Sequence, residues 1–263
     1  MHTSPSRRRL PRAVAGAATL ISLLGAGLSG PVAPASAAAA PLLGAPEVGR
    51  CYQITQAEAD ARSTTAPTVD CAEEHRLQIF AVVEVPARIG LKGKAFYDYA
   101  ARTCNPLASD LLGDGGVAFR RSAYEPGWLF VPTREQQAEG ARWVACMIGV
   151  AGGLQSRGDG GAPSQGLEET RGTVGTVSGR LPRDRRLCID RLGGAIARTH
   201  CARRHSHVML GSPVSLQGPA RVRDERAVEH CRAKVRRAQD WIWIWSTDLD
   251  DPRRFTVACF VPR

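Results

Sequence analysis

The chain has 263 residues, a formal net charge of +10 and eight cysteines. No segment after the first forty residues is apolar enough to cross a membrane, which excludes a multi-spanning membrane protein. The positive charge is uneven, because residues 38–179 hold 13 Lys and Arg against 16 Asp and Glu, whereas residues 180–263 hold 18 against 9. Any electrostatic attraction to a partner is therefore expected from the last third of the chain.

Residues 1–37 predict a secretory signal peptide. A basic segment, RRRLPR, precedes an apolar segment rich in Ala and Gly, and Ala35-Ser36-Ala37 offers a cleavage site of the Ala-x-Ala type. An uncleaved anchor is the weaker alternative, since the apolar segment is marginal in length for a bilayer span. We expect the mature protein to be secreted or to reside at the cell envelope, with no stable transmembrane anchor. An even number of cysteines in that compartment predicts a disulfide framework.

The spacing of the cysteines indicates an internal duplication. Residues 38–150 and 183–263 each hold four cysteines in the same order, and in each copy the second cysteine begins a Cys-x3-His sequence. The matched cysteines are Cys51, Cys71, Cys104 and Cys146 in the first copy and Cys188, Cys201, Cys231 and Cys259 in the second. Residues 151–182 are rich in Gly, Ser and Arg and predict a flexible linker. The sequence therefore predicts two tandem modules, of which the second is basic.

Each module is predicted to be a small α+β unit with the order strand, strand, helix, strand, strand. In the first module the strands are expected over TVDC, LQIFAVVEV, YEPGWLFVP and RWVACMIGV. A helix is expected over KAFYDYAARTC, and NPLASDLLG predicts a fresh helix with Asn105 as N-cap and Pro106 at its first position. In the second module a helix over RDERAVEHCRAKVRRAQ places Cys231 on its buried face, and strands follow over WIWIWSTD and FTVACFVP.

Modules of this size bury too little apolar surface to be comfortably stable without reinforcement. Since the unit is duplicated, disulfides are expected within a copy, joining its first cysteine to its second and its third to its fourth. The predicted bridges are Cys51–Cys71, Cys104–Cys146, Cys188–Cys201 and Cys231–Cys259. Pairing of the first cysteine with the fourth and of the second with the third is the open alternative.

The segment HCARRHSHV, His200–Val208, contains three histidines and one cysteine, which resembles half of a zinc site. Its sister segment DCAEEHRLQ keeps only Cys71 and His75, which match Cys201 and His205. Since zinc requires thiolates and these cysteines are expected to be oxidised, no metal site is predicted. We expect His75 and His205 to pack on their disulfides and to hydrogen-bond a backbone carbonyl. The alternatives are a binding role or use in an extracytoplasmic enzyme or metal-binding protein.

The basic helix of the second module is a candidate binding element. The candidate residues are Arg226, Arg232, Lys234, Arg236 and Arg237. Three interpretations stay open: a solvated face, a site for an anionic cell-wall polymer or lipid headgroups, and a contact with the acidic first module. Nucleic acid is excluded as a partner because it belongs to the wrong compartment.

The tryptophans Trp241, Trp243 and Trp245 occupy alternate positions and therefore share one face of the predicted strand. They are either a platform for stacking sugars or, more commonly for such residues, part of a core or interface.

The order Gly-x-Cys, Cys-x3-His, helix with Cys, Trp and a final Cys resembles the septum formation domain family, which comprises small extracytoplasmic modules of actinobacteria. The residues that carry the resemblance are Gly49, Cys51, Cys71, His75, Cys104, Trp128, Arg142 and Cys146, with Cys188, Cys201, His205, Cys231 and Cys259 in the second copy. The resemblance implies two tandem copies and involvement in cell division at the envelope.

The usual catalytic motifs are missing from the sequence: there is no Gly-x-Ser-x-Gly, no His-Glu-x2-His and no phosphate-binding glycine loop ahead of a helix. All eight cysteines have a plausible disulfide partner, so no free thiolate nucleophile is expected. The sequence thus predicts a non-enzymatic protein without a cofactor. It is expected to act by binding an anionic envelope component or an envelope protein.

Overall fold

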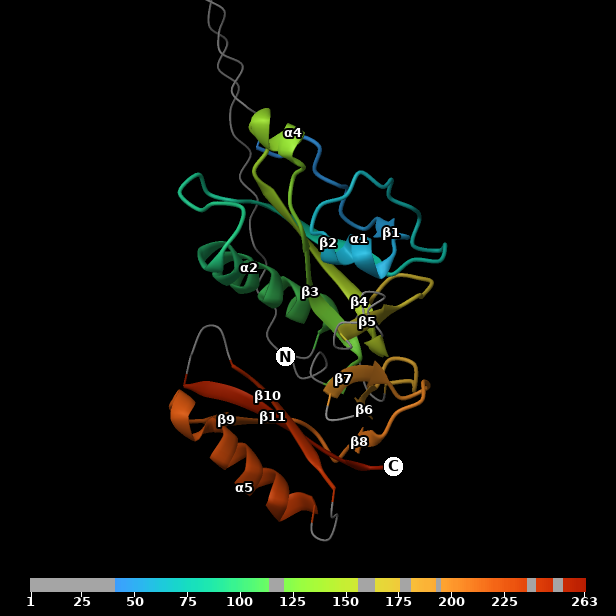
Figure 1. Ribbon diagram of the computed structural model, residues 1–263, viewed down its shortest axis with the longest axis vertical. Helices are drawn as coiled ribbons and strands as arrows, with labels where there is room; N and C mark the ends of the chain where they lie inside the picture. The colour runs from blue at the N-terminus through green and yellow to red at the C-terminus, as the bar shows by residue number, and fades with distance from the viewer. Residues whose placement is uncertain are drawn as a thin grey trace, which may run out of the picture. The chain divides into compact units, whose positions relative to one another are not determined.

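A computed structural model describes residues 41–113, 121–155, 164–175, 181–192, 195–235, 240–247 and 253–263. The predicted signal peptide and the candidate residues Arg236 and Arg237 lie outside these ranges. The described residues form a mixed fold in which all paired strands are antiparallel, with few helices (Figure 1). Among the described residues no helix is both long enough and apolar enough to cross a membrane.

The first half of the sheet is organised around one long strand that pairs with strands on both sides. Its strands are β1 (Cys51–Tyr52), β2 (Leu77–Glu84), β3 (Tyr124–Phe130), β4 (Trp143–Gln155) and β5 (Ser164–Glu168). Side chains of β4 alternate between two cores, as strand geometry requires. Ala145 and Met147 belong to a core with Leu77 and Ile79, whereas Val144 packs with Phe96 of the long helix on the opposite face.

The long helix α2 (Lys94–Leu112) is continuous through Pro106, so the prediction of a fresh helix at Asn105 is wrong. Proline lacks the N–H that would bond within the helix, which disfavours an interior position. Burial outweighs this cost, because Phe96, Ala100, Cys104, Ala108 and Leu112 recur every four residues and are at most 4% exposed. The apolar face therefore continues past the proline and holds both ends against the sheet.

Two short helices begin at capping boxes that the sequence analysis did not single out. In α1 (Gln56–Asp60) Thr55 pairs with Glu58, and in α4 (Arg134–Ala138) Thr133 pairs with Gln136. Each hydroxyl accepts a backbone N–H that the helix itself leaves unsatisfied.

In the second half of the sheet a helix packs on the last two strands (Figure 1). Its elements are β6 (Leu187–Leu192), β7 (Ala195–His200), β8 (His207–Met209), β9 (Val214–Gln217), η2 (Ala220–Val222), α5 (Arg223–Val235), β10 (Ile242–Thr247) and β11 (Arg254–Pro262). Along β11, Phe255 and Val257 face α5, whereas Ala258 and Phe260 face the core of β6 and β10.

Part of the segment predicted as a linker, residues 151–182, belongs to the sheet. Residues 151–155 extend β4, and β5 pairs with this part of β4 in antiparallel register. Leu167 is 1% exposed and Val174 joins a core cluster, so the few apolar residues of this Gly-rich segment anchor it to the first half. Much of the segment predicted as a flexible linker is therefore packed against the first half of the sheet.

The two halves of the sheet meet where Gly152 of β4 pairs with Thr199 of β7. A Cβ on Gly152 would lie 2.9 Å from the backbone carbon of Leu167 in β5. The close approach of β5 to β4 at this position therefore requires glycine. Nearby, the Arg198 guanidinium pairs with the Glu125 carboxylate at 2.9 Å and donates to two carbonyl oxygens of the first half. The halves therefore share both backbone pairing and a largely buried ion pair.

The four disulfides are those that the spacing favoured: Cys51–Cys71, Cys104–Cys146, Cys188–Cys201 and Cys231–Cys259. Their Cα–Cα distances lie between 5.1 and 5.6 Å, which is ordinary for such bridges. The longer bridge in each half ties its helix to a strand of the sheet, α2 to β4 and α5 to β11. Among the described residues no cysteine is free.

Candidate functional site

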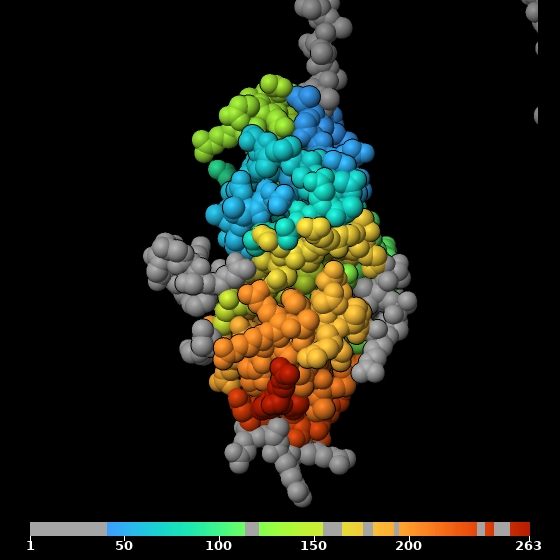
Figure 2. All heavy atoms as spheres, turned by 90° about the vertical axis from the view of Figure 1, so that its right-hand side faces the viewer, coloured from blue at the N-terminus to red at the C-terminus, as the bar shows by residue number. Residues whose placement is uncertain are grey.

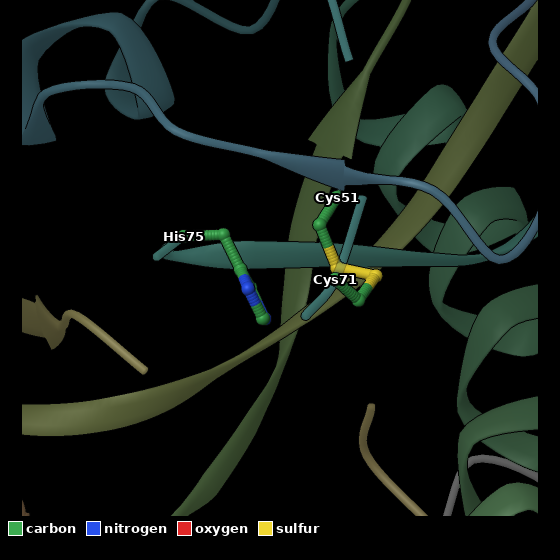
Figure 3. Close-up of side chains that lie close together, drawn as sticks. All are labelled: Cys51, Cys71 and His75. Atoms are coloured by element: carbon green, nitrogen blue, oxygen red, sulfur yellow. A yellow bond between two sulfur atoms is a disulfide. The ribbon is translucent and has the colours of Figure 1, made fainter. Parts of the chain in front are cut away.

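The His75 ring lies beside the Cys51–Cys71 disulfide and is 2% exposed (Figure 3). Its Nδ1 lies 2.9 Å from the backbone oxygen of Glu73. A carbonyl oxygen only accepts, so Nδ1 must carry the proton and donate. The expected hydrogen bond of His75 to a backbone carbonyl is present, and the ring lies next to the disulfide as expected.

The same three side chains form the group with metal-like spacing in the described part of the chain. One ligand atom from each of Cys51, Cys71 and His75 lies within 4.8 Å of the others. Both sulfur atoms are bonded to each other, however, and a metal needs thiolate ligands. The donor set therefore does not fit a zinc ion while the bridge is intact.

His205 makes the same kind of hydrogen bond in the second half as His75 makes in the first. Its Nδ1 lies 2.7 Å from the backbone oxygen of Arg203, and the ring is 8% exposed beside Cys201. The two Cys-x3-His segments thus close the same side-chain-to-backbone hydrogen bond after the same disulfide position.

A pocket of about 340 Å³ opens at His205, which the sequence analysis missed. Its lining combines apolar and cationic residues: Arg183, Arg186, Cys201, His205, Val208, Met209 and Arg263. In Figure 2 the dark-red C-terminal residues lie at the surface among orange residues of the second half. The sequence feature that could have indicated this pocket is the basic run RDRR from Arg183 to Arg186. Its position beside His205 and Arg263 depends on the tertiary fold.

A larger cavity of about 540 Å³ lies in the first half. It is lined by Ala59, Asp60, Arg62, Tyr97, Glu125, Gly127, Trp128, Leu129 and Gln165. Several polar groups of its wall already have partners: Glu125 pairs with Arg198, Gln165 bonds the backbone of Arg198, and the Arg62 guanidinium lies over the Tyr97 ring at 4.4 Å. These interactions give the cavity wall a structural function at the junction of the two halves.

The described basic residues of α5 divide between two helix faces. Residues spaced three and four apart are neighbours on a helix, so Arg223, Arg226, His230 and Lys234 share one face, which holds no acid. Arg232 lies on another face with Glu225 and Glu229. Among the described residues, no carboxylate oxygen lies within 4.0 Å of a side-chain nitrogen of Arg226, Arg232 or Lys234. The face of Arg223, Arg226, His230 and Lys234 is called the cationic face below.

Trp241 and Trp243 are half-buried and pack with Val214 and Leu216 on the core under α5. Their rings lie 5.4 Å apart between centroids. The two tryptophans share a face as predicted, and that face is the one covered by α5 rather than a free platform. The side chain of Trp245 lies outside the described part of the chain.

Among the described residues, the arginines that form ion pairs between the basic and acidic halves are Arg198 and Arg203. Arg203 pairs with Glu168 of β5, and His200 Nε2 lies 3.8 Å from the same carboxylate. Desolvation nevertheless dominates at His200 and lowers its pKa, while Glu168 acts in the opposite direction. Burial also lowers the pKa of His230, with Lys234 adding to the effect.

These two histidines predict a loss of stability in mild acid. Because their folded-state pKa values lie below the usual value of 6.5, the unfolded chain takes up protons first as the pH falls. The free energy of unfolding is expected to be highest above the unfolded pKa and to decrease from about pH 7.5 to about pH 5.5. Urea denaturation across that range measures it. His200→Gln should flatten the decrease, and an equally steep decrease in this variant would contradict the assignment.

No protein-family model, curated protein or solved structure matches this chain. The site therefore has to be interpreted from its own chemistry.

Proposed function

We propose that the protein is a secreted, non-enzymatic cell-envelope protein, similar to septum formation proteins, that acts by binding an anionic envelope component. In this proposal it consists of two copies of one disulfide-linked module. The repeated Cys-x3-His hydrogen bond and the bridge from a helix to a strand in each half support the duplication. The four disulfides are consistent with an oxidising compartment outside the cytoplasm.

The observation that carries the binding proposal is the segregation of charge on α5. Arg226 is exposed and Lys234 is half-buried, on a face from which the acids of the helix are absent. A face with one sign of charge attracts phosphate or carboxylate groups of a polymer, or anionic lipid headgroups, without opposing repulsion. The His75 ring is 2% exposed beside an intact disulfide, which does not support the competing proposal of an enzyme that uses His75.

Salt-dependent binding tests this proposal. Binding of the purified mature protein to a cell-wall fraction should weaken by roughly tenfold as ionic strength rises from about 0.01 M to about 0.15 M, because the screening length falls from about 30 to about 8 Å. Arg226→Gln with Lys234→Gln should lower the low-salt affinity and reduce its salt dependence. Sedimentation of the protein with the wall fraction measures both.

A matched control separates location from net charge. Arg191→Gln with Arg232→Gln removes the same two charges, but from β6 and from the other exposed face of α5. This control should keep most of the affinity. Binding that does not change with salt concentration, or an equal loss of affinity in the two double variants, would contradict the proposed role of the cationic face.

A further inference from the structure

The two disulfide–histidine units differ in what covers them. Around His75, an extended segment of the same chain forms an antiparallel bridge: the His75 N–H donates to Thr170 O at 2.9 Å, and the Thr170 N–H donates to His75 O at 2.8 Å. Gly172 N–H donates to the Cys71 carbonyl at 2.6 Å. The first unit is therefore sealed by a strand-like segment that uses backbone hydrogen bonds.

The covering segment also brings a carboxylate. Glu169, immediately before the bridging residue, pairs with Arg76 at 2.5 Å, and Arg76 immediately follows His75. Backbone pairing and one ion pair thus hold residues 169–172 in place over the first disulfide.

In the second unit, residues of the 183–186 segment accept from the backbone N–H groups of Cys201 and Ala202, but no described segment pairs with His205. Among the described residues, the backbone N–H and C=O of His205 have no backbone hydrogen-bond partner. In the described part of the chain, the donor to the Cys201 carbonyl is the Arg183 guanidinium, at a long 3.4 Å. The pocket at His205 occupies this place, and of its lining residues in the described chain three are arginines and none is acidic.

Arg186 contributes one of the three positive charges that line this pocket. Its Nε is buried and has no hydrogen-bond partner among the described residues. A buried donor without a partner costs stability, and the Arg186 side chain lines the pocket, so its positive charge is available to an anionic ligand there. Arg183 and Arg263 are exposed lining residues that add positive charge at the same opening.

We infer that the pocket at His205 is a docking site for an extended peptide segment that carries an acidic side chain. The segment would pair its backbone with His205, as Thr170 pairs with His75, and direct a carboxylate toward Arg183 and Arg186. Addition of an extended peptide to open backbone groups supplies affinity, and the flanking side chains supply specificity. The inference rests on the proposed function only in that the protein acts by binding, since the pocket shares no residue with the cationic face of α5.

The chain itself supplies the probe. A fluorescent peptide with the sequence LEETRGTVG, residues 167–175, contains the bridging threonine and both glutamates. With the oxidised mature protein, its fluorescence anisotropy should show saturable binding. Arg186→Gln is expected to weaken this binding by about tenfold or more, because it removes a charge-assisted donor at the pocket. The exposed Arg183→Gln serves as a second variant that leaves the buried part of the pocket unchanged.

Two modified peptides separate the parts of the recognition. Replacing both glutamates by glutamine should cost affinity similar to Arg186→Gln, and N-methylation at the threonine should also weaken binding because it removes the pairing N–H. Arg191→Gln, which lies on β6 and pairs with Asp240, is the matched control and should bind the peptide normally.

Several results would overturn the inference. They are absence of saturable binding, full affinity in both Arg183→Gln and Arg186→Gln, indifference to N-methylation, and displacement of the peptide by an equal concentration of inorganic phosphate. The last result would indicate a simple oxyanion site. Failure of this test is distinguishable from failure of the proposed function, because Arg226→Gln with Lys234→Gln affects only binding to the wall fraction.

Discussion

Removal of the Cys104–Cys146 disulfide, by replacing both cysteines with alanine, is expected to lower the free energy of unfolding by about 2–5 kcal/mol. The bridge spans 42 positions and joins α2 to the central strand β4, where both residues are buried. A cross-link over such a loop restricts the unfolded chain, and its loss also removes buried sulfur atoms from the contact of helix and sheet. Urea denaturation of the double variant measures the loss.

The Cys188–Cys201 bridge provides the comparison, because it spans only 13 positions. In the loop-entropy description the shorter loop contributes about 1 kcal/mol less. The corresponding double alanine variant should therefore be less destabilised. If the short bridge proved the more stabilising of the two, the account of these disulfides as constraints on chain entropy would be contradicted.

Arg198→Met is expected to destabilise the protein by about 3 kcal/mol, because it leaves the Glu125 carboxylate without its charged partner in a largely buried place. The two side chains are 21% and 23% exposed, and Arg198 also donates to the backbone oxygens of Ser122 and Tyr124. The arginine thus connects β7 to the segment that leads into β3. Thermal and urea denaturation of the variant measure the effect.

Two further variants identify the cause of that loss. Arg198→Met combined with Glu125→Gln removes the unpaired charge and should recover part of the stability, since breaking a buried pair costs more than replacing both partners. Arg191→Met breaks the exposed pair with Asp240 and should cost less than about 1 kcal/mol. No recovery in the first variant would show that the effect comes from lost packing instead of an unpaired carboxylate.

Features with local periodicity were predictable from the sequence. Cysteines at matched positions indicated the four bridges, and apolar residues at helical spacing placed Cys231 on the buried face of α5, next to Cys259. Alternation placed Trp241, just before β10, and Trp243 of β10 on one face, where they pack in the same core. These features depend on residues within one element or on the order of cysteines, which a sequence displays directly.

Features that depend on tertiary contact were not predictable. Pro106 indicated a helix boundary by its own chemistry, and burial of residues on both sides of it decided otherwise. The composition of residues 151–182 indicated a linker, but Leu167 and Thr170 attach much of it to the sheet and to His75. The arginines at the His205 pocket come from separate segments, so only the fold brings them together.

The central claim is that an exported chain carries two modules, each cross-linked by its own four cysteines. Peptide mapping by mass spectrometry under non-reducing conditions, on protein recovered from outside the cytoplasm, tests it most directly. The account predicts four linked peptide pairs, Cys51 with Cys71, Cys104 with Cys146, Cys188 with Cys201 and Cys231 with Cys259. Eight free thiols, or any bridge from residues 38–150 to residues 183–263, would contradict it.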